Sequence, residues 1–321
     1  MKKEFFSTQT PLGETLSLYK NFWEGPELSE TLAIVSGLHG DRLNGLMAAS
    51  RLSRFLGDIA QGREPDFKIT GNIQIFPVVN LPALSEGNAA WSYDNLDADR
   101  AFPGLEEGDL TETLCHAVLQ QTAQSDYGII LQTAEPHYTD APHIKMISAN
   151  LKGLARNLDL RVAREIAEFP ALTLQLIKQW HALGMASFIL SAGTPGVVDP
   201  SQSDILFESV LNFMLVTGFL SHTHRKGHKR ELDFYPAKNE CTLLTKHSGM
   251  FLPKSKVGNW LNVDQTVGEV VDLYSGEVLE TVTAREAGFL VTLRVYPLVH
   301  EQEPVAVLLT RKNKRRFWPF S

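Results

Sequence analysis

The segment GLHGDRLNG, residues 37–45, holds side chains whose types and spacing could do chemistry. A strand-like apolar run ends at His39, and Arg42 follows three residues later. In a turn, His-x-x-Glu is a spacing at which two side chains can hold one zinc ion. Arg42 stands at the second of these positions, and a guanidinium has no lone pair for a metal and repels a divalent cation. The segment therefore predicts a polar site in which a fixed positive charge stands where a metal ligand could.

Further polar side chains follow three other apolar, strand-like runs. Parallel strands present their carboxyl ends at one edge of a sheet, so the loops that leave these ends are expected to share a site. The second run leads to a loop containing DADRAFPG, the third to LQTAEPHYTDAPHIK and the fourth to LSAGTPG. The candidate residues in these loops are Asp99, Arg100, Gln132, Glu135, His137, His143, Lys145 and Ser191.

The elements that must position these loops alternate between strands and helices from about residue 31 to residue 220. Continuous apolar strands separated by helices are typical of a mostly parallel sheet that is covered on both faces. A long loop with Pro136 and Pro142 is expected after the third strand. We expect strands within 31–40, 72–80, 127–133 and 186–193, and helices at about 46–59, 109–118, 149–168, 171–184 and 203–220.

The last third of the chain has a different pattern. Residues 222–240 are polar and charged, which suits a linker. Beyond them, short apolar runs are separated by Gly, Ser-Gly and Pro, which favours a small β-barrel or sandwich. We therefore predict an α/β domain at 1–235, with a mixed, mostly parallel sheet flanked by helices, and a β-rich C-terminal domain at 236–321.

The composition narrows the class of partner. The 321-residue chain is 43% hydrophobic, enough for a core, and its net charge of −7 argues against a nucleic-acid binder. It has no apolar run long enough for a membrane span, and its N-terminal apolar run is too short for a signal peptide. Cys115 and Cys241 form no CxxC pair, so we expect buried thiols, a reducing compartment and a cytoplasmic location. Whether the chain forms a homo-oligomer stays open.

Two of these segments resemble the motifs of a known family. GLHGDRLNG is similar to the Gly-x-His-Gly-Asp/Asn-Glu-x-x-Gly motif of the succinylglutamate desuccinylase/aspartoacylase family, and DADRAFPG is similar to its Asp-Leu-Asn-Arg-x-Phe-Pro-Gly motif. The order of the segments and the β-rich C-terminal part extend the resemblance over nearly the whole chain. The resemblance implies a zinc-carboxypeptidase-like fold and an ancestry among zinc-dependent hydrolases that remove acyl groups from amino acids.

The resemblance also assigns a role to individual positions, and the metal site is degenerate. His39 matches the first zinc ligand. Arg42 stands where the family has its Glu ligand, and Gln132 stands where it has its second His. Ser191 stands at the position of the general-base Glu.

The positions that the resemblance assigns to substrate contacts are better preserved. Arg100 is retained, although Asp99 precedes it where the family has an Asn. Lys145 is a candidate replacement for a substrate-binding Arg. The substrate-binding candidates are therefore Arg42, Arg100, Asp99 and Lys145.

These substitutions bear directly on the reaction. A catalytic zinc needs about three protein ligands, and its water needs a base. Gln132 is at best a weak ligand, and Ser191 without a nearby base cannot take a proton from water. We therefore expect no cofactor and no zinc-dependent hydrolysis. Because Zn²⁺ with one Glu carries the same net charge as Arg42, the site is expected to bind a small anion, such as an acyl amino acid or a dicarboxylate, without cleaving it.

Two alternatives remain open. Arg42 could pair only with Asp41 or Asp99, in a packed cleft that binds nothing. The protein could also be an active metal-dependent deacylase, an amidohydrolase whose zinc ligands have been rearranged around His39, His137 and His143, because imidazole nitrogens suit zinc.

Overall fold

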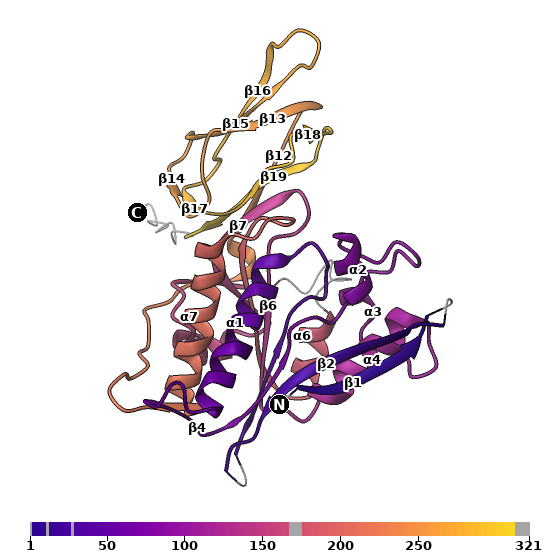
Figure 1. The fold of residues 1–321 in the computed structure, drawn as a ribbon. Helices are drawn as coiled ribbons and strands as arrows, with labels where there is room; N and C mark the ends of the chain where they lie inside the picture. The colour runs from indigo at the N-terminus through magenta and orange to yellow at the C-terminus, as the bar shows by residue number, and fades with distance from the viewer. Residues whose placement is uncertain (1, 11–12, 27–28, 167–174, 312–321) are drawn as a thin grey trace. The chain divides into compact units, whose positions relative to one another are not determined.

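The computed structural model describes residues 2–10, 13–26, 29–166 and 175–311 of the chain. The chain divides into two compact units, an N-terminal unit, Met1–Phe234, and a C-terminal unit, Tyr235–Ser321. Figure 1 shows the helices and strands of both units. In the parts that the structure describes, no helix is long and apolar enough to cross a membrane.

The N-terminal unit is built on a mixed sheet. Its central strands run parallel, whereas β2 and β7 are antiparallel to the neighbours β5 and β9. The short strands β4 (Phe67–Ile69) and β10 (Leu220–His222) pair with each other apart from it. In spatial order the strands of the sheet are β1 (Lys2–Gln9), β2 (Thr15–Trp23), β5 (Asn72–Phe76), β3 (Thr31–Val35), β6 (Tyr127–Gln132), β9 (Ala186–Gly193), β7 (Tyr138–Met146) and β8 (Val162–Glu165).

Helices cover both faces of this sheet, which is why its central strands are apolar along their length. One face packs against α1 (Leu43–Ala60) and α7 (Pro200–Thr217), and the other against α3 (Ala98–Ala101), α4 (Leu110–Thr122) and α6 (Gln175–Ala182). Figure 1 shows these two groups of helices on opposite sides of the strands. The α/β architecture predicted from the sequence is thereby confirmed.

The helix ends follow local sequence signals. Asp109 caps α4 and forms a reciprocal capping box with Glu112. Asp199 caps α7, and Gly218 ends that helix in the left-handed conformation. Asn80 caps the short helix α2 (Leu81–Glu86), which directly follows the loop after β5.

Two sequence predictions are wrong. Residues 149–168 do not form one helix. The chain makes three short helical turns, η1 (Ala149–Leu151), α5 (Lys152–Ala155) and η2 (Arg156–Leu158), then reverses at Asp159 with φ of 50° and enters β8. The segment predicted as a long loop with Pro136 and Pro142 contains the strand β7. The pairing of β7 with β9 is irregular between Asp140 and His143, and Pro142 is tolerated because it lies in this irregular stretch. The predicted helix 171–184 corresponds to α6, but its first residues lie outside the described part of the chain.

The C-terminal unit is β-rich, as predicted, and its strands pair antiparallel. It has its own apolar core, which includes Phe251, Leu290 and Leu308. Cys241 in this unit is only partly buried, whereas Cys115 on α4 is buried, so the prediction of two buried thiols holds for Cys115 alone. One set of paired strands is β12 (Glu240–Leu244), β19 (Pro304–Thr310), β17 (Gly288–Arg294) and β14 (Trp260–Leu261). The other is β16 (Val278–Thr283), β15 (Thr266–Val271), β13 (Gly249–Pro253) and β18 (Leu298–Val299). The short elements β11 (Asp233–Tyr235) and η3 (Ala237–Asn239) lie at the division between the units.

Candidate functional site

The turn after β3 is held in shape by the loop after β5. The Ser36 hydroxyl donates to the Pro77 carbonyl at 2.6 Å, and the Asn80 backbone N–H donates to the Gly37 carbonyl at 2.7 Å. Gly37 has φ of +64°, which favours glycine. At Gly40 any side chain would overlap the backbone of Ala83. This packing fixes the turn that carries His39 and Arg42.

His39 is buried and oriented by a carboxylate. Its Nε2 lies 2.8 Å from Oδ1 of Asp97. Burial alone would raise the pKa of Asp97, but the hydrogen bond and charge of His39 outweigh burial and hold that pKa below its ordinary value. Asp97 is therefore an ionised acceptor, and the Nε2 of His39 carries the proton. The buried Nδ1 of His39 has no hydrogen-bond partner among the described residues.

Arg42 is also buried, with 4% of its side chain exposed. Its Nη1 donates to Oε1 of Gln132 at 3.0 Å, and its Nη2 donates to Oε2 of Glu135 at 2.6 Å. Partial desolvation would raise the pKa of Glu135, but the positive charges of Arg42 and then Lys145 lower it overall, so Glu135 is ionised. The guanidinium thus points to the end of β6, and its ion pair in the described structure is with Glu135 rather than with Asp41 or Asp99.

A row of three polar residues crosses the sheet beside Arg42. Gln132 on β6 is paired with Ser191 on β9, which is paired in turn with His143 on β7. Directly paired residues project to the same face, and adjacent strands lie about 4.8 Å apart. Ile130 and Ile189, two residues earlier, pack in the core on the α4 and α6 side, so the row faces that side as well. The sheet therefore brings together three positions that are far apart in the sequence.

Asp140 adds a buried carboxylate that the sequence did not single out. The Ser191 hydroxyl donates to Oδ2 of Asp140 at 2.7 Å, and the Lys145 Nζ lies 3.7 Å from the same oxygen. Burial lowers the pKa of Lys145, and Asp140 offsets only part of that effect. Asp140 was missed because the sequence from 133 to 145 was interpreted as a loop. The signal that could have found it is the strand-like stretch of β7 itself.

His143 is neutral in this environment. Burial lowers its pKa to about 3, although the nearby carboxylate of Asp140 acts in the opposite direction. Its Nδ1 lies 2.8 Å from the Ala141 carbonyl and donates to it. The buried Nε2 is therefore left with a lone pair, and it has no partner among the described residues.

The remaining predicted residues lie at the margin of this cluster. The Nε of Arg100 is 3.5 Å from Oδ2 of Asp97, and 55% of the Arg100 side chain is exposed. Asp99 is buried. His137 is exposed in the loop before β7 and has φ of 76°. Arg100 is thus linked to His39 through Asp97.

The donor set at this site does not fit a catalytic zinc ion. His39 offers one imidazole nitrogen, but Arg42 is a cation, and the Gln132 oxygen already accepts a hydrogen bond from it. Within residues 2–311 as far as they are described, no three His, Cys, Asp or Glu side chains are grouped so as to hold a metal. The rearranged set of His39, His137 and His143 is therefore not assembled in this part of the structure.

Comparison with known proteins places this geometry in a known fold. No family model matches the sequence. A curated relative, N-alpha-acetyl-L-2,4-diaminobutyric acid deacetylase of Halomonas elongata, is 33% identical over 91 residues, which are 28% of this chain and 23% of that protein. The chain therefore matches less than a quarter of the length of that relative.

Solved structures match over almost the full length. A succinylglutamate desuccinylase/aspartoacylase from Rhodobacter sphaeroides has a TM-score of 0.80 at 19% identity, with 97% of this chain and 96% of that chain covered. The ectoine utilization protein EutE (DoeB) from Ruegeria pomeroyi, solved with product bound, has a TM-score of 0.79 at 16% identity, with 97% and 95% covered. An aspartoacylase family protein from Mesorhizobium loti has a TM-score of 0.78 at 20% identity, with 96% and 93% covered. The chain therefore has the fold of the succinylglutamate desuccinylase/aspartoacylase family, as the two motifs predicted.

Proposed function

We propose that this protein belongs to the succinylglutamate desuccinylase/aspartoacylase family, has lost zinc-dependent amide hydrolysis and binds a small carboxylate ligand such as an acyl amino acid. The observation that carries the proposal is the position of Arg42, whose guanidinium donates to Gln132 and Glu135. In the family pattern, two of these three positions belong to zinc ligands. A guanidinium supplies positive charge there without a metal.

Unpartnered donors at the site support an acceptor-rich ligand. The Nε of Arg42 and the Nε2 of Gln132 are buried and have no partner among the described residues. Leaving a buried donor unsatisfied costs about 1–3 kcal/mol, so a carboxylate that accepts from both is favoured. Glu135 is 47% exposed, and its carboxylate already shows how such a group binds this guanidinium.

Hydrolysis by the remaining groups is disfavoured. The Ser191 hydroxyl donates a hydrogen bond to Asp140, and a neutral hydroxyl is too weakly basic to take a proton from water. Without a metal, the pKa of water stays far above that of a carboxylic acid, so a carboxylate alone is a poor base for it. The Asp140 carboxylate also forms an ion pair with the buried Lys145 ammonium. We infer that the site holds its ligand rather than cleaving it.

The deciding experiment combines metal content with ligand binding. Protein purified without chelators is expected to contain well under one zinc per chain by mass spectrometry. Isothermal titration with N-acetyl-L-aspartate and N-succinyl-L-glutamate is expected to show binding to the native protein and a loss of about 50-fold in affinity for Arg42→Met, from the loss of charge-assisted hydrogen bonds. Arg54→Met is the matched control, because Arg54 lies on α1 with its side chain 87% exposed. Stoichiometric zinc together with turnover of either compound would refute the proposal.

An active metal-dependent deacylase is the second candidate, with His39 as a ligand but without the set His39, His137 and His143 in the described structure. One observation favours it: Asp97 orients the imidazole of His39 through Nε2 and its buried Nδ1 has no partner among the described residues, the arrangement that metal-binding histidines use. On this alternative, His39→Ala would remove both the metal and the turnover. The metal measurement above separates the two candidates.

A further inference from the structure

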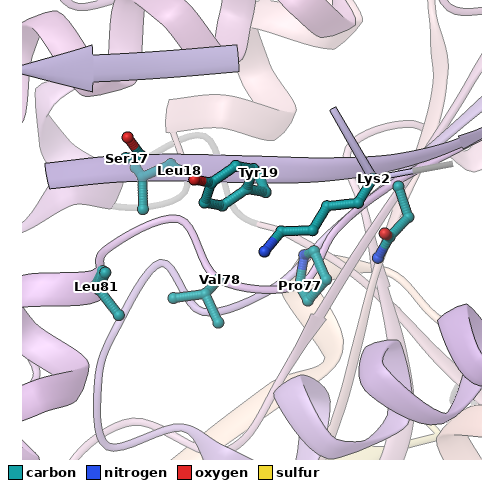
Figure 2. Close-up of a pocket in the computed structure, with 8 residues that line it drawn as sticks. Lys2, Ser17, Leu18, Tyr19, Pro77, Val78 and Leu81 are labelled. Atoms are coloured by element: carbon teal, nitrogen blue, oxygen red, sulfur yellow. The ribbon is translucent and has the colours of Figure 1, made fainter. Parts of the chain in front are cut away.

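A hollow lies in the N-terminal unit, outside the cluster around Arg42. It has a volume of about 320 Å³ and lies between β2 and the loop Pro77–Leu81 (Figure 2). It exists because β2 is paired with β5 only at Asn21–Trp23. The earlier residues of β2 pair with β1 on one side, and on the other side they face the loop instead of β5.

The walls of this hollow combine an apolar surface with one ammonium group. Leu18 on β2 and Val78 and Leu81 on the loop side supply apolar surface. Lys2 comes from β1, and Figure 2 shows its side chain lying across the hollow, between Tyr19 and the loop. The Nζ of Lys2 is 3.8 Å from the centre of the Tyr19 ring. Within the described residues, no carboxylate lies at ion-pair distance from Lys2.

The floor of the hollow is a fixed surface. The Pro77 carbonyl accepts from the Ser36 hydroxyl, and the Asn80 backbone N–H donates to Gly37. The same loop then enters α2 through the Asn80 cap. A floor held on its far side in this way needs little rearrangement to accept a ligand, which lowers the entropic cost of binding.

We propose that this hollow is a binding site for a small monocarboxylate with an aromatic or branched aliphatic body. The carboxylate pairs with the Lys2 ammonium, and the body lies on Leu18, Val78 and Leu81. Charge complementarity selects an anion, because in the described part of the chain the ammonium contacts the Tyr19 ring and no carboxylate. The volume lies at the lower end of the range of small-molecule sites, about 300–1,000 Å³, so the ligand is small. This site does not depend on the function proposed for the Arg42 cluster.

The test uses 3-phenylpropionate as the probe and 3-phenylpropanamide as its uncharged analogue. Isothermal titration is expected to show that the acid binds the full chain and that the amide binds at least five times more weakly. Lys2→Gln is expected to weaken binding of the acid about tenfold, the size of one charge-assisted hydrogen bond. Lys2 is exposed near the chain start, so this variant should fold normally.

Lys3→Gln is the matched control. It removes the same charge one residue along β1, from an ammonium that lies 4.9 Å from the Phe22 ring rather than over the hollow. Equal weakening by both variants, or equal affinity for acid and amide, would overturn the proposal. In methyl NMR spectra, the probe is expected to shift the signals of Leu18, Val78 and Leu81. Shifts confined to residues around Arg42, or binding lost in Arg42→Met, would place the probe in the other site and overturn this one.

Discussion

Two cations in the N-terminal unit have opposite surroundings. Arg42 is buried, with its guanidinium engaged by Gln132 and Glu135 at the carboxyl end of β6. Lys2 is exposed on the edge strand β1 and contacts the ring of Tyr19. A buried cation with a fixed partner shapes the protein around it, whereas an exposed one is available to an incoming anion at little desolvation cost. Charge alone therefore does not identify a binding site, because burial and existing partners in the described part of the chain leave Arg42 only its Nε for a ligand, whereas the ammonium of Lys2 is accessible.

The largest expected effect comes from reversing the substitutions around Arg42. Arg42→Glu combined with Gln132→His would place a carboxylate and an imidazole beside His39, which already has the orientation of a ligand. Zinc affinity is expected to rise by at least about a hundredfold over the native chain, measured by competition with a fluorescent chelator. Catalysis is not expected, because Ser191 still stands at the base position. An unchanged zinc affinity would mean that the side chains at 42 and 132 do not decide metal binding.

The next effect concerns stability. Asp140→Asn leaves the buried Lys145 without its counter-charge at 3.7 Å and is expected to lower the free energy of unfolding by about 3 kcal/mol. Urea denaturation at pH 7 measures it. Adding Lys145→Met to that variant removes the unpaired cation and should recover part of the loss. If the double variant is as unstable as the sum of both single ones, Asp140 and Lys145 act independently.

His143 gives a pH dependence with a defined sign. Its pKa is about 3 in the folded protein because of burial, and about 6.5 in the unfolded chain, so the unfolded state binds more protons between these values. Its contribution to stability is full above about pH 6.5 and is lost as pH falls, by about 1.4 kcal/mol per pH unit. His143→Gln should remove this slope from urea titrations between pH 6.5 and 4.5. The same change at the exposed His181 serves as the control and should leave the slope in place.

The smallest effect concerns Glu135. Its carboxylate occupies Nη2 of Arg42 but is 47% exposed, so it competes only weakly with a ligand carboxylate. Glu135→Gln is expected to raise the affinity for acyl amino acids about threefold in isothermal titration. A fall in affinity would show instead that Glu135 holds Arg42 in its binding position.

Much of the fold was predictable because its signals are local. The apolar runs that become β3, β5, β6 and β9 are continuous. Asp109 is of a residue type that commonly caps helices, and it caps α4. The strand β7 was missed because its middle reads TDAPH, which is polar and contains Pro142. Its strand conformation depends on pairing with β9, which only the tertiary structure supplies.

The site was predictable only in part. The family resemblance predicted His39, Arg42, Gln132 and Ser191 as neighbours, and the sheet places these side chains at adjoining strand ends. The sequence left Asp41 and Asp99 open as partners of Arg42, because they are close in sequence or motif, whereas in the structure Glu135 reaches the guanidinium from another loop. The hollow beside Lys2 depends on where β2 separates from β5, and no residue pattern encodes that position.

Gly40 in the turn after β3 and Gly45 at the start of α1 affect how proteins with this fold are recognised from sequence. Gly40 lies against the backbone of Ala83 and Gly45 against that of Leu131, so neither position has room for even a methyl group. A side chain is excluded at both positions whether or not any reaction takes place nearby. A search that matches those glycines therefore detects a backbone shape shared by this fold, and the identity of the side chain at position 42 is the better guide to the chemistry of the site.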